Sequence, residues 1–129
     1  MFAAGDQKPV FEKEGKKYGL TICADIDLPG LYKYYAEQGC ELVLECASPD
    51  IYGDRAQRDW EKGYTWWKNN CQQKIGSYAR VNKIKIAVAT QRGRNQEDDF
   101  PGGGYLFLEN GEIACQTEDY QQEVLVVDV

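Results

Sequence analysis

The sequence contains no histidine among its 129 residues. This absence excludes a Ser-His-Asp triad, a Cys-His pair and any zinc site with histidine ligands within the chain. Catalysis by its own side chains would therefore use cysteine, lysine, tyrosine or carboxylates. Three acidic residues are adjacent at positions 97–99. Adjacent carboxylates can bind a metal ion, but they are common on protein surfaces and do not by themselves predict a metal site. We expect neither a metal nor another cofactor.

The chain also lacks any run of about 18 apolar residues and any apolar core near its start, so the sequence predicts neither a membrane span nor export. Its five cysteines are irregularly spaced without a Cys-x-x-Cys pair, which favours reduced thiols and a cytoplasmic location. Fifteen basic residues stand against 21 acidic ones, for a net charge of −6. This balance disfavours nucleic-acid and membrane partners.

Hydrophobic periodicity predicts an α/β fold. Strands are expected over 10–13, 18–23, 41–46, 84–90, 104–109, 112–116 and 123–129. Helices are expected over 28–38 and 54–82, the second capped by Asp54 and divided between Gly63 and Asn70. The strand–helix–strand order from 18 to 46 predicts a parallel pair with a right-handed crossover. Residues 91–103 are expected to form a long loop, and Asn110-Gly111 to turn a hairpin.

One cysteine is distinguished by its place along the predicted sheet. Cys23 ends an apolar strand and precedes a helix, and catalytic groups in α/β sheets gather at the carboxyl ends of strands. The backbone N–H of Ala24 can stabilise an oxyanion there. Asp25 and Asp27 either take part in the site or cap the turn. On the residues alone, a lone cysteine at a strand end is more often a small buried residue.

Further segments are expected near this strand end. The loop that contains Ala47 and Ser48 follows the next strand along the chain, and residues 90–93 follow the strand after that. Trp60 lies in the long helical stretch with two other tryptophans, at positions 66 and 67. These rings can either wall a pocket or fill the core.

Two carboxylates lie close to this region in the sequence. Glu41 and Glu45 are on the strand that follows the first helix, and either is a conceivable base for a thiol in a chain without imidazole. The alternation of that strand aims neither side chain at Cys23, so we do not assign them this role.

An ordered series of short motifs runs through nearly the whole chain. The series comprises Gly5-Asp6, the segment GKKYGLTICAD at 15–25, Leu28-Pro29, GCELVL at 39–44, Ala79 with Asn82, Phe100-Pro101-Gly102, and Asn110-Gly111-Glu112-Ile113. In this order it resembles the carbon–nitrogen hydrolases, the nitrilase superfamily, from the middle of their domain to near its C-terminal end. The segment around Cys23 resembles the nucleophile motif of that family.

The resemblance implies an α/β fold that forms the C-terminal part of a four-layer αββα sandwich. Residues 1–129 would then be a single partial domain whose N-terminal segments are absent. The family pairs as dimers, so we expect a homo-oligomer, a dimer or larger.

The resemblance also implies a chemistry. The family hydrolyses non-peptide carbon–nitrogen bonds of small linear amides or nitriles through a cysteine thioester. Cys23 would be the nucleophile, and the backbone of Ala24 would contribute to the oxyanion hole. We expect Asp25, Ala47, Ser48 and Trp60 to contact the substrate.

The catalytic Glu and Lys of the family belong to segments that precede the matched motifs. We therefore expect this chain by itself to be nearly inactive. Two alternatives stay open: an inactive half-domain that serves as an interaction module, and a redox-sensing thiol protein.

Overall fold

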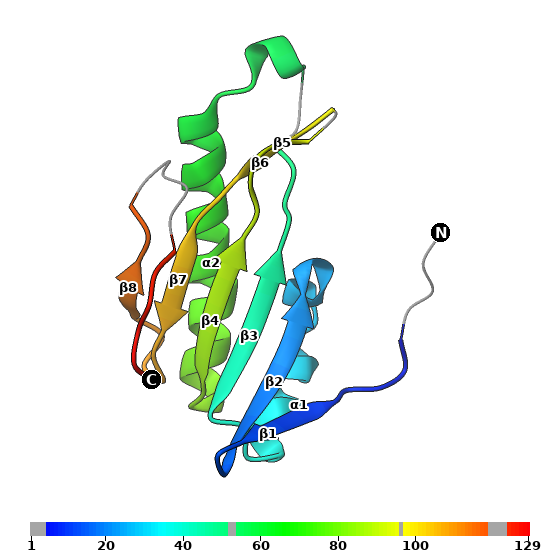
Figure 1. Cartoon of the computed structure of the whole chain (residues 1–129), viewed down its shortest axis with the longest axis vertical. Helices are drawn as coiled ribbons and strands as arrows, with labels where there is room; N and C mark the ends of the chain where they lie inside the picture. Colours follow the sequence, from blue (N-terminus) through cyan, green and yellow to red (C-terminus); the bar gives the residue numbers. More distant parts are fainter. Residues whose placement is uncertain (1–4, 52–53, 96, 119–123) are drawn as a thin grey trace.

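The computed structural model describes residues 5–51, 54–95, 97–118 and 124–129, and Figure 1 shows them as one mixed sheet with helices behind it. The six strands are β1 Val10–Lys13, β2 Lys16–Ile22, β3 Leu42–Ala47, β4 Lys85–Thr90, β7 Gly104–Phe107 and β8 Ile113–Gln116, in the order β1-β2-β3-β4-β7-β8. The central strands β2, β3 and β4 are parallel. The parallel pair predicted from the strand–helix–strand order is confirmed.

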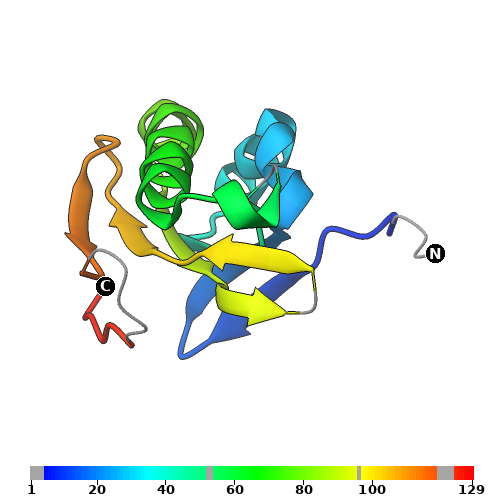
Figure 2. The same cartoon turned by 90° about the horizontal axis from the view of Figure 1, so that it is seen from above.

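Both α-helices cover the same face of the sheet, which Figure 2 shows from above. They are α1 Pro29–Glu37 and α2 Trp60–Asn82. The expected division of the second helix is wrong, since α2 is continuous through Gly63 and Asn70. Its N-terminal cap is not Asp54 but Asp59. The Asp59 carboxylate accepts hydrogen bonds from the backbone N–H groups of Glu61 and Lys62. A short 3-10 helix, η2 Arg55–Gln57, comes before it.

The two glycines of α2 mark close packing rather than helix ends. A Cβ on Gly63 would lie 2.8 Å from the Cδ1 atom of Ile51, and one on Gly76 would lie 2.9 Å from the backbone oxygen of Gly111. Neighbouring segments therefore approach the helix where a side chain is missing. The packing gained offsets the usual cost of about 1 kcal/mol for a glycine inside a helix.

The expected loop over 91–103 is wrong in its central part. It forms a two-stranded antiparallel hairpin, β5 Arg92–Asn95 and β6 Asp98–Pro101. The hairpin extends beyond the carboxyl ends of the parallel strands (Figure 1). The expected strand over 123–129 is also wrong for residues 124–129, which are not in a strand, while Glu123 lies outside the described residues.

The Asn110-Gly111 turn is confirmed between β7 and β8. Gly111 has a φ of 87°, and the Asn110 side chain accepts a hydrogen bond from the backbone N–H of Glu112 at 2.9 Å. Glycine takes this left-handed conformation without strain, which is why the dipeptide turns the chain here.

The two faces of the sheet differ in their cover. On the helix side, Val43, Ile86 and Phe107 are fully buried against helix residues such as Tyr32 and Tyr35. On the other side no helix covers the sheet in the described part of the chain, and apolar side chains such as Ile22 and Leu44 are exposed. None of the described helices combines the length and hydrophobicity needed to cross a membrane.

Candidate active site

Cys23 lies at a sharp turn between a strand and a helix. It directly follows β2 and begins the 3-10 helix η1, Cys23–Asp27, with a φ of 48°. This left-handed conformation is strained for a residue with a Cβ, at a cost of about 1–3 kcal/mol, and such strain concentrates at functional sites. The side chain is half-buried. A similar strand-to-helix turn presents the nucleophile at the edge of the sheet in α/β-hydrolases.

The turn is held by an aspartate two residues beyond the cysteine. The Asp25 carboxylate accepts the backbone N–H of Ile22 at 2.9 Å. Asp27 forms an ion pair with Lys74 of α2, and the Tyr78 hydroxyl donates to the backbone oxygen of Ile26 at 2.9 Å. The capping contact considered for the two aspartates is thus present at Asp25, whereas Asp27 forms an ion pair, and a role of either in the site stays a prediction.

The carboxyl ends of the three parallel strands meet beside this turn, as the sequence predicts. The backbone N–H of Gln91, after β4, donates to the oxygen of Ala47, at the end of β3, over 2.9 Å. The side chains of Ser48 and Gln91 are also hydrogen-bonded to each other. The loops that contain Ala47 and Ser48 therefore open at the edge where Cys23 lies.

Glu45 is a buried carboxylate under this edge. Only 1% of its surface is exposed, and Oε2 accepts from the Tyr32 hydroxyl at 3.0 Å. Burial raises the pKa of the Glu45 carboxyl, and the hydrogen bond from the Tyr32 hydroxyl acts against that shift. Oε1 has no hydrogen-bond partner among the described residues.

The three tryptophans of α2 have different environments. Trp67 is buried in the core and donates from Nε1 to the Thr90 hydroxyl over 2.8 Å. Trp66 is 45% exposed. Trp60 is half-buried, and the Arg92 guanidinium lies 5.1 Å from the centre of its ring. Contact between Trp60 and substrate stays a prediction, as it does for Asp25, Ala47 and Ser48.

A group of charged side chains fixes the hairpin beyond the sheet edge. Asp99, on β6, is fully buried and accepts from Arg58 Nη1 at 3.1 Å and from Arg94 Nε at 2.8 Å. The Asp50 carboxylate accepts the backbone N–H of Asp99 at 3.1 Å. The sequence analysis missed this network. Among the described residues no group of acids, cysteines or histidines is placed to hold a metal ion.

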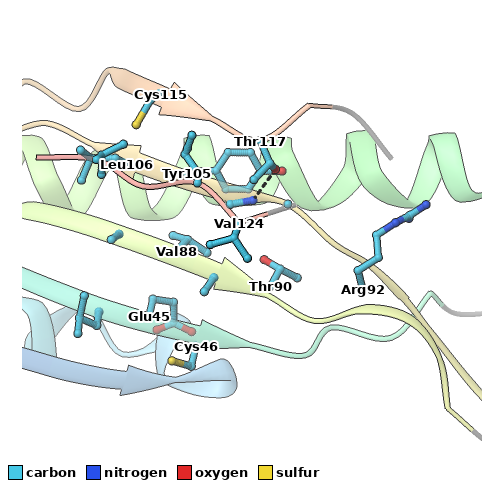
Figure 3. A pocket seen from close by; sticks show the side chains of 17 residues that line it. Glu45, Cys46, Val88, Thr90, Arg92, Tyr105, Leu106, Cys115, Thr117 and Val124 are labelled. Carbon is cyan, nitrogen blue, oxygen red and sulfur yellow. Dashed lines mark hydrogen bonds between the residues drawn. The ribbon is translucent and has the colours of Figure 1, made fainter. Parts of the chain in front are cut away.

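One cavity lies on the open face of the sheet rather than at Cys23. Its volume is about 590 Å³, between the strands and the C-terminal residues 124–127 (Figure 3). Cys46 and Cys115 line it together with apolar side chains, whereas Cys23 does not. The cavity is the space between an apolar sheet face and the segment that crosses it, so we do not assign it as the reaction site.

A comparison with known protein families shows which family the chain belongs to. A family model described as carbon-nitrogen hydrolase matches residues 1–129. The chain belongs to the carbon–nitrogen hydrolase family. The resemblance seen in the motifs is thereby confirmed, and Cys23 lies where the nucleophile motif of the family was matched.

Relatives of this carbon–nitrogen hydrolase chain are longer proteins. The glutamine-dependent NAD(+) synthetase of Acinetobacter baylyi is 26% identical over 124 residues, 95% of this chain and 20% of that protein. The structure of the Acinetobacter baumannii NAD+ synthetase matches with a TM-score of 0.75 and 25% identity, over 95% of this chain and 21% of that one. This chain thus spans about a fifth of those relatives.

A nitrilase-superfamily amidase has the same fold. The Nesterenkonia amidase, solved as a cysteine-to-alanine mutant, matches with a TM-score of 0.70 and 22% identity, over 90% of this chain and 39% of that chain. The nitrilase-like α/β fold expected from the motifs is confirmed. The described residues supply the six-stranded sheet, the two-stranded β5–β6 hairpin and one helix layer of it.

Proposed function

We propose that the protein hydrolyses the carbon–nitrogen bond of a small linear amide or nitrile, with Cys23 as the nucleophile. The observation that carries this proposal is the left-handed turn at Cys23, at the carboxyl edge of the parallel strands, in a chain of this family. Relatives named amidase favour the amide. The substrate would be a small molecule, since the negative net charge disfavours nucleic acid.

The proposed reaction has two halves. The Cys23 thiolate attacks the carbonyl carbon, and the negative charge that develops on oxygen is stabilised by the backbone N–H of Ala24. The carbon–nitrogen bond then breaks, the nitrogen leaves as ammonia or an amine after taking a proton, and a thioester remains on Cys23. Water adds to the thioester carbon, and the acid and the free thiol are released.

We expect the general base to come from outside residues 1–129. Glu45 is the buried carboxylate beside the turn, but it lies on the helix side of β3, and Glu41 is exposed at the opposite end of that strand. The family resemblance assigns the base and a lysine to preceding segments. The apolar open face of the sheet, which includes Leu44, would be covered by the rest of the sandwich or by a second copy in a homo-oligomer.

Release of ammonia from butyramide tests the proposal. Butyramide is a suitable probe because a mutant of the related amidase has been solved in complex with it. In the complete natural protein, Cys23→Ala should lower kcat/KM by about a thousandfold or more. Catalytic residues act together, so the loss of the nucleophile alone removes most of the rate enhancement. Cys115→Ala, on the distant strand β8, should stay within about twofold of wild type. Equal turnover in the Cys23 variant would contradict the proposal and favour the interaction-module or redox-thiol alternatives.

A further inference from the structure

Arg92 is a cation that has no acidic partner among the described residues. Its neighbours Arg58 and Arg94 both form ion pairs with the buried Asp99. None of the ion pairs within the described part of the chain includes Arg92. The chain has 21 acidic residues against 15 basic ones, so acids are in excess. A guanidinium that stays unpaired in such a chain is available to an anion from outside.

The Arg92 side chain is nevertheless held in place by uncharged groups. Its guanidinium carbon lies 5.1 Å from the centre of the Trp60 ring, and Nη1 donates to the backbone oxygen of Pro101 at 3.2 Å. A Cβ on Gly102, where φ is 80°, would lie 2.6 Å from the Arg92 Cδ atom. The side chain therefore passes through space that a glycine leaves open. These contacts orient the guanidinium and leave its charge unbalanced, so an anion can bind with little further ordering.

One edge of this guanidinium is left to a ligand. The hydrogen bond to Pro101 uses Nη1, whereas Nε and Nη2 of Arg92 have no hydrogen bond to the described residues. These two nitrogens direct parallel N–H groups from one edge of the planar group. Two parallel donors match the two oxygens of a carboxylate, and its single negative charge balances that of one guanidinium.

Arg92 lies at the same edge of the sheet as Cys23. Ile22, Cys46 and Ala89 form one row across the parallel strands β2, β3 and β4. Cys23 is the first residue beyond this row and Arg92 is the third, and β2 and β4 are two strand spacings apart, about 10 Å. Arg92 and Cys46 both line the cavity on the open face (Figure 3). A small linear molecule with one end at the thiol can therefore reach Arg92 with its other end.

We propose that Arg92 binds a carboxylate of the substrate, so that the protein acts on amides that carry a carboxylate a few bonds from the amide group. The carboxylate accepts from Nε and Nη2 while the amide carbon lies at Cys23. Arg92 determines specificity and takes no part in breaking the carbon–nitrogen bond. The proposal rests on the proposed function in placing the reacting carbon at Cys23.

Two pairs of matched amides test this specificity in the complete natural protein. Succinamate differs from butyramide by a carboxylate in place of the terminal methyl group, and glutaramate differs from valeramide in the same way. In at least one pair, kcat/KM should be about tenfold or more higher for the acid, because a charge-assisted pair forms with Arg92. No preference for the acid in either pair would overturn the proposal.

Substitution of Arg92 assigns the preference to this side chain. Arg92→Gln should lower the acid-to-apolar ratio of kcat/KM about tenfold or more. Arg92→Lys keeps the charge without the planar fork and should retain part of the ratio, and this variant decides the matter if Arg92→Gln does not fold. Arg80→Gln, at an exposed arginine near the end of α2, should leave the ratio unchanged. A preference that persists in both Arg92 variants at the wild-type level would overturn the proposal.

Binding to the Cys23→Ala protein separates this proposal from the proposed function, because binding needs no turnover. In titration calorimetry, succinamate or glutaramate should bind about tenfold or more tighter than its apolar counterpart, and a second substitution, Arg92→Gln, should remove the difference. If the wild type hydrolyses none of the four amides but this difference is found, the proposed function is wrong and the carboxylate site stands. If all four are hydrolysed with a ratio that Arg92 does not affect, the function stands and the site is wrong.

Discussion

At the scale of the residue, Glu45 is a carboxylate whose burial bears on stability. Burial raises the pKa of its carboxyl above the ordinary value. The folded state therefore binds a proton more tightly than the unfolded state, and stability falls as the pH rises from the unfolded pKa, about 4.3, through the raised folded pKa. Above the raised folded pKa, the carboxyl is ionised and the protein carries the full cost of the buried charge.

Replacement of this carboxylate should therefore stabilise the fold at alkaline pH. We expect Glu45→Gln to have a higher free energy of unfolding than the wild type at pH 8, by about 1 kcal/mol. The difference should shrink as the pH falls toward 4. Urea unfolding at several pH values measures it, with Glu41→Gln as the exposed control. A difference that grows as the pH falls would contradict the raised pKa.

Two residues illustrate what the sequence reveals at this scale. Cys23 can be selected from five cysteines because it ends an apolar strand before a helix. Glu45 can also be singled out from the sequence, since an acid between Leu44 and Cys46 is out of place in a buried segment. The partner of its carboxylate was not predictable, because the hydrogen bond comes from Tyr32 in α1.

At the scale of the element, α2 and the β7–β8 hairpin fit together through two glycines. A Cβ on Gly111 would lie 2.5 Å from the backbone oxygen of Gly76, and its φ of 87° is unfavourable for alanine. We expect Gly111→Ala to lower the free energy of unfolding by more than about 2 kcal/mol.

The matched substitution is Gly30→Ala. Gly30 lies near the start of α1 with no atom within 4 Å of an added Cβ, so alanine should change stability by no more than about 0.5 kcal/mol. Chemical denaturation of both variants measures the difference. Equal stability of the two would show that the hairpin does not approach α2 as closely as described.

The hairpin β5–β6 depends on its buried acid. Asp99→Asn removes the charge that pairs with Arg58 and Arg94, and Arg58 has only 11% of its side chain exposed. Breaking a buried pair from one side costs about 3 kcal/mol. Asp98→Asn, at the exposed neighbouring position, should cost less than about 0.5 kcal/mol. Thermal unfolding of the two variants distinguishes them, and similar melting temperatures would contradict the network.

The errors made at this scale have physical causes. Gly63 and Gly76 resemble helix breakers, and only the positions of Ile51 and Gly111 explain why the helix continues. The hairpin was read as a loop because its residues are polar and do not alternate. Charge pairing between distant segments, such as Arg58 with Asp99, leaves no periodic signal in the sequence.

At the scale of the whole molecule, the sheet has one covered face and one apolar open face. The 129-residue chain expressed by itself should therefore self-associate, to a dimer or larger assembly, through the open face. Leu44→Glu places a charge on that face and should shift the chain toward the monomer in sedimentation velocity. Val81→Glu, an exposed apolar position on α2, should leave the assembly unchanged. The opposite pattern would assign association to the helix side.

Much of the architecture at this scale follows from the sequence. The strand–helix–strand order determines the parallel pair around Cys23, and the Asn110-Gly111 turn determines the outer hairpin. The C-terminal segment was misassigned because apolar residues such as Val124 and Val126 suit a strand. In this structure Val124, Leu125 and Val127 line the cavity on the open face of the sheet instead.

The proposed role of Cys23 as the nucleophile can be tested with fluoroacetamide. The acetamide moiety of this compound adds covalently to the active-site cysteine in a mutant of the related amidase. The thiolate displaces fluoride and acquires a carbamoylmethyl group. Peptide mapping after brief exposure of the complete natural protein should find this group on Cys23 and on none of the other four cysteines. Modification of Cys46 or Cys115 ahead of Cys23 would contradict the account.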